Sequence, residues 1–102
     1  MPRQAPRTIE ELKAAKEREK AKIESAVLPD RSMFGTDNRA AEKVLMDTFD
    51  KLIAGGRPNA LEDKLYSMAD VSSTMYDTVG GAIALCNWAN GWEDETFEAK
   101  ES

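Results

Sequence analysis

Apolar residues recur every three or four positions from Leu61 to Cys86, and this pattern limits the fold more than any other feature of the chain. A spacing that alternates between four and three residues places side chains along one face of an α-helix. We therefore expect one long helix over residues 60–90, with a seam against which another helix packs. The seam consists of Leu61, Leu65, Met68, Ser72, Met75, Val79, Ala82 and Cys86.

The second half of this segment, residues 78–92, carries no charge, although 32% of the chain is charged. A helix that crosses a bilayer needs about 20 apolar residues, so this stretch is too short to span one. It also contains Gly80-Gly81, and glycine weakens a helix by about 0.5 to 1 kcal/mol relative to alanine. We expect the helix to continue to Asn90 with a weak point at Gly80, where two helix backbones approach closely, and to end at Gly91.

A shorter helix precedes this segment. Residues 38–54 carry a broad apolar stripe with helical spacing. Gly55-Gly56 then predicts a helix end, because glycine readily adopts the left-handed conformation found there. Asn59 lies three residues before Glu62, which is the spacing of a capping box at the start of the next helix. The short link predicts an antiparallel hairpin of the two helices.

An N-terminal helical arm is predicted before the hairpin. Residues 1–7 contain two prolines and two arginines and should form an extended, mobile tail. Thr8 and Glu11 have capping-box spacing, and residues 9–25 are rich in good helix formers. The apolar face of this helix is thin, so we expect it to pack on another surface. The expected arm contacts are Ile9, Leu12, Ile23 and, in the connector that follows, Phe34.

The predicted fold class is all-α, an antiparallel helical hairpin with the additional N-terminal arm. We divide the chain into an arm and connector (1–36), a hairpin core (37–92) and an acidic tail (93–102). The helix over residues 60–90 exceeds its partner by about three turns. Either the arm or another chain should cover this surplus, since a large exposed apolar patch is unusual on a monomer. An oligomer or a larger assembly is therefore expected.

Composition excludes several kinds of active site. The chain has no histidine, which removes the commonest general base and the commonest metal ligand. Cys86 lies on the seam, where a small core residue is expected. The acidic cluster Glu93, Asp94 and Glu95 lacks the spacing of a calcium loop and is expected to be a solvated tail. We expect no enzyme activity, no catalytic, cofactor or metal site, and a soluble, cytoplasmic protein without a membrane segment.

These features favour a non-enzymatic assembly or adaptor protein, whose partner is a copy of itself or a larger complex. Its predicted interface consists of Leu61, Leu65, Met68, Met75, Val79, Gly80, Ala82, Trp88 and Trp92. Two alternatives stay open. The acidic body could mimic nucleic acid and block a basic site on an enzyme. The basic N-terminal arm, residues 1–22, could instead contact nucleic acid through phosphate groups.

Overall fold

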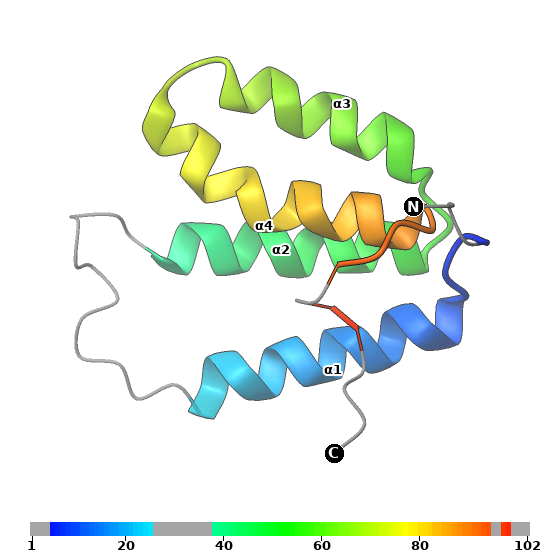
Figure 1. The fold of residues 1–102 in the computed structure, drawn as a ribbon. Coiled ribbons are helices and arrows are strands. Elements are labelled where there is room, and N and C mark those ends of the chain that lie inside the picture. Colours follow the sequence, from blue (N-terminus) through cyan, green and yellow to red (C-terminus); the bar gives the residue numbers. More distant parts are fainter. Residues whose placement is uncertain (1–4, 26–37, 95–96, 99–102) are drawn as a thin grey trace.

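The protein is described by a computed structural model that covers residues 5–25, 38–94 and 97–98. Within these ranges it is all-helical, as the sequence predicts, with four helices and no strand: α1 (Ile9–Ser25), α2 (Asn38–Ile53), α3 (Pro58–Ala69) and α4 (Ser73–Ala89). The helices stack in the order α1, α2, α4, α3 (Figure 1). The predicted extents of the first two helices are confirmed.

Helix α4 lies at the centre of the bundle, which explains why its sequence is almost free of charge. It packs against α3 on one side and against α2 on the other. A helix that is covered on several sides needs apolar residues all around its axis. The uncharged run that begins at Thr78 is therefore a core helix and the turn that follows it.

The prediction of one helix over residues 60–90 is wrong, because the chain turns back between α3 and α4. Ser72 has an extended backbone, and its hydroxyl accepts a hydrogen bond from the backbone N–H of Met75 at 3.1 Å. Ser72 is thus the N-cap of α4, and the helix breaks at residues 70–72 instead of at Gly80. Short polar side chains such as those of serine and aspartate compete with helical backbone bonds and favour caps.

This break also changes the predicted hairpin. The packed antiparallel pair is α3 with α4, whereas α2 packs on α4 and runs in the same direction (Figure 1). The apolar surplus expected on a single long helix is covered within the chain, on one side of α4 by α3 and on the other by α2 and the arm.

Local signals at the helix ends are largely confirmed. The Thr8 hydroxyl accepts from the Glu11 N–H at 3.1 Å, and a Glu11 carboxylate oxygen accepts from the Thr8 N–H at 3.2 Å. Gly55 and Gly91 both have left-handed φ, 102° and 104°, and each ends a helix. The capping box at Asn59 is wrong, because Arg57 is the N-cap of α3 and its side chain accepts no capping hydrogen bond. Pro58 occupies the first turn, where its missing N–H costs nothing.

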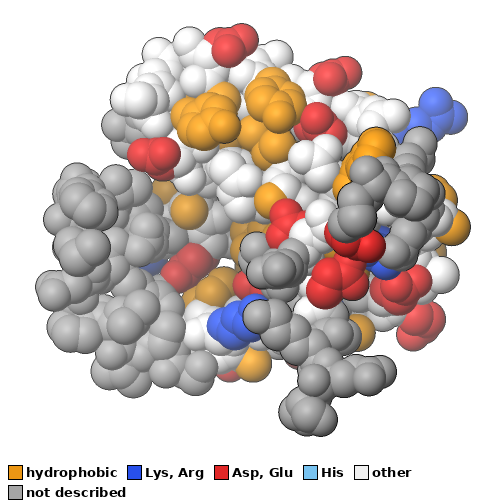
Figure 2. Space-filling view, viewed as in Figure 1, with side chains coloured by type: hydrophobic (Ala, Val, Ile, Leu, Met, Phe, Trp, Pro, Cys, Tyr) orange, Lys and Arg blue, Asp and Glu red, His pale blue; other side chains and the backbone are white. Residues whose placement is uncertain are grey.

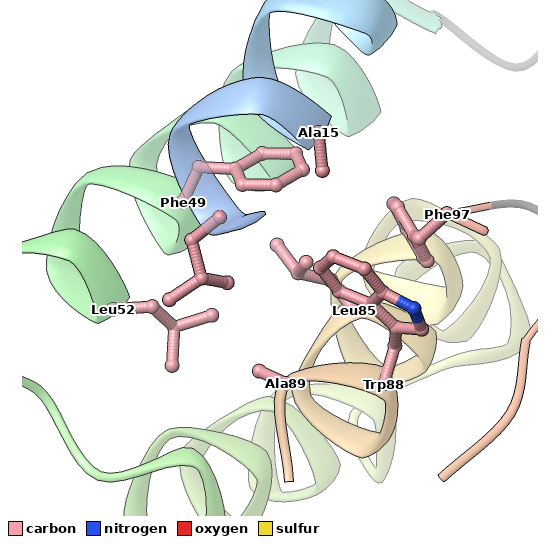
Figure 3. Packing of buried hydrophobic residues seen from close by; sticks show 8 residues of the cluster. Ala15, Phe49, Leu52, Leu85, Trp88, Ala89 and Phe97 are labelled. Carbon is pink, nitrogen blue, oxygen red and sulfur yellow. The ribbon is translucent and has the colours of Figure 1, made fainter. Parts of the chain in front are cut away.

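Two clusters of buried side chains form the core, one on each side of α4. The first joins α1, α2, α4 and the C-terminal segment (Figure 3) and contains Leu12, Ala15, Phe49, Leu52, Leu85, Trp88, Ala89 and Phe97. The second joins α3 to α4 and contains Leu65, Val79, Ala82, Ile83 and Cys86. The arm is therefore part of the core, and Leu12 and Ala15 are its buried contacts.

The close approach of two backbones predicted at Gly80 is not found among the described residues. A Cβ atom added to Gly80 or Gly81 would meet no heavy atom within 4 Å. The seam residues Val79 and Ala82 are buried, but Gly80 lies beside that seam and faces open space. The helix continues through both glycines.

The expectation of a mobile tail is corrected for Arg7, and that of a solvated tail for Phe97 and Glu98, because these residues contact the bundle. Residues 1–4, 95–96 and 99–102 lie outside the described part of the chain. Phe97 is buried, with its ring centroid 6.0 Å from that of Phe49. The Arg7 guanidinium lies 4.9 Å from the centre of the Trp88 ring and donates to a Glu98 carboxylate oxygen at 2.6 Å. That oxygen also accepts from the Trp88 indole N–H at 3.1 Å.

Candidate interaction surface

The most exposed aromatic side chains of α3 and α4 are two tyrosines on the same side of the helical pair. Tyr66 is 44% exposed and Tyr76 is 55% exposed. Each follows directly after a residue of the α3–α4 cluster, Leu65 on α3 and Met75 on α4. In an antiparallel pair of helices, the residues that follow two facing residues turn toward the same side of the pair. We call Tyr66 and Tyr76 the tyrosine face.

The space-filling view agrees with this geometry. Figure 2 shows hydrophobic side chains gathered over α3 and the beginning of α4, with acidic side chains around them. Val71, in the turn between the two helices, adds an aliphatic side chain that is 77% exposed. The tyrosines lie five residues before and five residues after Val71, so the two helices present them at a similar distance from the turn.

Carboxylates adjoin both tyrosines. Glu62 and Asp70 lie four residues before and after Tyr66, and residues at that spacing are neighbours on a helix surface. Asp77 follows Tyr76 directly and is exposed. The pKa of Glu62 is raised above its ordinary value, first because partial burial disfavours the charged form and second because Asp63 is negatively charged.

Most residues of the predicted interface pack against other residues of the same chain. Leu65, Val79 and Ala82 are buried between α3 and α4, with Leu61 and Met75 packed beside them. Trp88 is 2% exposed and belongs to the other cluster, with Phe97 against its ring.

The remaining predicted interface residues are accessible to different degrees. Gly80 is half-buried, whereas Met68 and Trp92 are exposed. Among the described residues, the large apolar side chains that another molecule could reach are therefore those of the tyrosine face and its turn, together with Met68, Trp92 and Ile9 of the arm.

The predicted arm contacts also differ in how far they are buried. Leu12 is in the core, Ile23 is half-buried and Ile9 is exposed. Phe34 lies outside the described residues.

Several basic residues of the arm make contacts within the chain. Lys16 pairs with Asp50 of α2, Lys22 with Glu19, and the Arg18 guanidinium donates to the Phe97 carbonyl at 2.7 Å. In the acidic segment, Glu98 pairs with Arg7, while Glu95 lies outside the described residues. The residues invoked for nucleic-acid contact and for enzyme inhibition thus partly hold the ends of the chain to the bundle.

The interface and arm contacts predicted from the sequence do not include Arg7, Phe97 or the tyrosine pair. Arg7 and Phe97 are single residues in charged or proline-containing segments, and no periodicity marks them. The tyrosine pair could have been found from the Asp-Val-Ser-Ser sequence at residues 70–73, which is rich in residues that favour caps and turns. Recognising that turn would have placed Tyr66 and Tyr76 on one hairpin.

Cys86 is a free cysteine that is buried in the α3–α4 cluster. Burial raises the pKa of the Cys86 thiol to about 12, and the nearby Glu62 carboxylate adds to this effect. The thiol is therefore protonated and enclosed at neutral pH, which disfavours nucleophilic chemistry. Within the described ranges, no group of three or more potential ligands could hold a metal ion. Among the same residues, no helix has both the length and the apolar character needed to cross a bilayer.

Comparison of this chain with protein family models, with characterised protein sequences and with solved structures found no match.

Proposed function

We propose that this protein is a small, non-enzymatic assembly or adaptor protein that binds another protein through the tyrosine face. The observation that supports the proposal is the exposure of Tyr66 and Tyr76 on one side of a helical pair whose other apolar residues are largely buried. Tyrosine is enriched at the points of protein interfaces that contribute most to affinity. Its ring supplies apolar area and its hydroxyl supplies a hydrogen-bonding group.

The fold suits this role because it holds the tyrosines on two helices that pack firmly together. Side chains on packed helices lose less conformational entropy on binding than those on a loose segment. The two neighbouring side chains that pack inward, Leu65 and Met75, belong to the α3–α4 cluster and fix the orientation of the surface.

The double variant Tyr66→Ser/Tyr76→Ser tests the proposal, because both side chains are exposed and their loss should leave the fold intact. Sedimentation velocity measures self-association, and quantitative mass spectrometry compares the host proteins that wild type and variant retain. We expect the variant to lose self-association or at least one protein partner. The matched control is Ile9→Ser/Trp92→Ser, which removes exposed apolar surface from other elements of the bundle.

The outcome that contradicts the proposal is a monomer that retains the same proteins with and without the tyrosines. If only the control variant loses association, the interface lies at Ile9 and Trp92 and the tyrosine face is not the binding surface.

A further inference from the structure

The apolar area of the tyrosine face is too small to support binding alone. Two half-exposed tyrosine rings would bury on the order of 200 Å² on contact. Association costs a protein pair more translational and rotational free energy than burial of that area returns. A partner of the tyrosine face must therefore make further contacts with the polar groups that surround it.

Those surrounding groups are mostly acidic. Over α3, α4 and the turn between them the sequence has four acidic residues, Glu62, Asp63, Asp70 and Asp77, and a single basic one, Lys64. The two other helices are balanced, with five basic and five acidic residues in α1 and three of each in α2. The helical pair that carries the tyrosine face is thus negatively charged, whereas α1 and α2 carry no net charge.

This distribution disfavours a second copy of the chain as the partner. Two tyrosine faces brought together would place Glu62, Asp70 and Asp77 of one copy near the same carboxylates of the other. Like charges placed together in an interface oppose association. The charge-balanced surfaces of α1 and α2 offer no compensating excess of positive charge.

We propose that the tyrosine face binds a cationic segment of another protein, with lysine or arginine side chains that pair with Glu62, Asp70 and Asp77. This inference rests on the proposed function and specifies its partner. Apolar residues of the segment cover the two tyrosine rings, and cations above the rings gain a further attraction from their π-electrons. Positive charge at the rim also steers the partner toward the surface.

Burial and the neighbouring Asp63 already disfavour the charge on Glu62, as its raised pKa indicates. A cation that approaches this carboxylate would stabilise the charged form. Binding of the partner is therefore expected to lower the pKa of Glu62.

Two synthetic helical peptides with identical leucine positions provide the probe. One has lysine at its polar positions and the other has glutamate. Fluorescence anisotropy of each labelled peptide, titrated with the full-length protein, gives the dissociation constant. We expect the lysine peptide alone to bind, with an affinity that falls as salt is raised, because salt screens exposed charges.

Charge variants and a tyrosine variant distinguish the contribution of ion pairs to binding from that of apolar contact. Glu62→Gln/Asp70→Asn/Asp77→Asn is expected to weaken binding of the lysine peptide about tenfold, because three ion pairs at the rim of the tyrosine face are lost. Its matched control, Glu17→Gln/Glu24→Gln/Asp47→Asn, changes the net charge equally at exposed positions of α1 and α2 and should leave affinity near that of the wild type. Tyr66→Ser/Tyr76→Ser should abolish binding.

The outcomes distinguish this inference from the proposed function. Equal binding of both peptides, or equal weakening by both charge variants, overturns the cationic partner but leaves an interaction through the tyrosines. Self-association that requires the tyrosines, when neither peptide binds, also overturns the cationic partner and leaves the proposed function standing. If neither peptide binds and the tyrosines affect no association, both proposals fail.

Discussion

Gly80 and Gly56 are two glycines for which the same substitution should have opposite effects. A Cβ atom at Gly80 enters open space inside a helix, whereas a Cβ atom at Gly56 would lie 2.7 Å from the Lys51 carbonyl oxygen. Gly80→Ala is therefore expected to raise the free energy of unfolding by about 0.5 to 1 kcal/mol, and Gly56→Ala to lower it. Urea unfolding followed by circular dichroism measures both.

Gly81→Ala is the control for Gly80→Ala, because that position is helical and open as well. Equal gains at the two positions are expected. A loss at Gly80 alone would mean that another part of the molecule approaches the helix there.

The raised pKa of Glu62 makes a second prediction about a single residue. The folded protein holds the Glu62 proton more tightly than the unfolded chain does, so the folded state binds more protons at pH values between the two pKa values. Stability is therefore lost as the pH rises through this window above about 4.5. Glu62→Gln is expected to be more stable than wild type at pH 7.

Thermal unfolding of both proteins at pH 4 and pH 7 checks this expectation. The advantage of Glu62→Gln should shrink at the lower pH, where Glu62 of the wild type becomes protonated. An advantage that is the same at both pH values would show that charge on Glu62 is not its cause.

The separation of α3 from α4 depends on the cap at Ser72. Ser72→Ala removes the hydroxyl that accepts from the Met75 N–H, which should cost about 1 kcal/mol of stability. Ser67→Ala is the matched control, because the Ser67 hydroxyl donates to the Asp63 carbonyl within a helix. That change should be nearly neutral, and chemical denaturation of both variants makes the comparison. Equal stability of the two would argue against a capping role for Ser72.

Helix ends that depend on neighbouring residues were predictable from the sequence, and the number of helices was not. The Thr8–Glu11 capping box and the glycines at positions 55 and 91 act within one helical turn, so their spacing in the sequence is sufficient. The heptad spacing from Leu61 to Cys86 misled because buried residues on two packed helices can keep the same spacing across a turn. The cap at Ser72 is the local signal for a new helix start, and it contradicts the continuous helix that the heptad spacing predicts.

At the scale of the molecule, Arg7 joins three parts of the chain. Its side chain is mostly buried, and its guanidinium contacts the Trp88 carbonyl and the Glu98 carboxylate. The positive charge also lies at the C-terminal end of α4, where the helix dipole favours it. Arg7→Met keeps much of the aliphatic stem but removes these contacts, and it is expected to cost about 2 kcal/mol.

Thermal unfolding of Arg7→Met should be compared with that of Arg57→Met. Arg57 is exposed and lies at the N-cap of α3, where a positive charge gains nothing from the dipole. We expect little change or a small gain at Arg57. Equal effects at the two positions would mean that the contacts of Arg7 add no stability.

Contacts of this kind lie beyond what the sequence pattern could predict, and so does the burial of Phe97. They join residues that are far apart in the chain, and neither segment has a periodicity that indicates its partner. The tyrosine face was missed for a related reason, because Tyr66 and Tyr76 become neighbours only after the turn at Val71 is known.

The pairing of Arg7 with Glu98 also has a consequence for how the protein is made. The two residues are 91 positions apart. A ribosome that adds about 5 to 20 residues per second therefore takes on the order of 5 to 20 seconds to synthesise the partner of Arg7. Helix α1 emerges first, yet Phe97, which covers its buried face, and Glu98 emerge much later. Of the four described helices, the one that leaves the ribosome first is thus among the last to complete its native contacts. During most of the synthesis of residues 7–98, α1 therefore lacks part of its native packing.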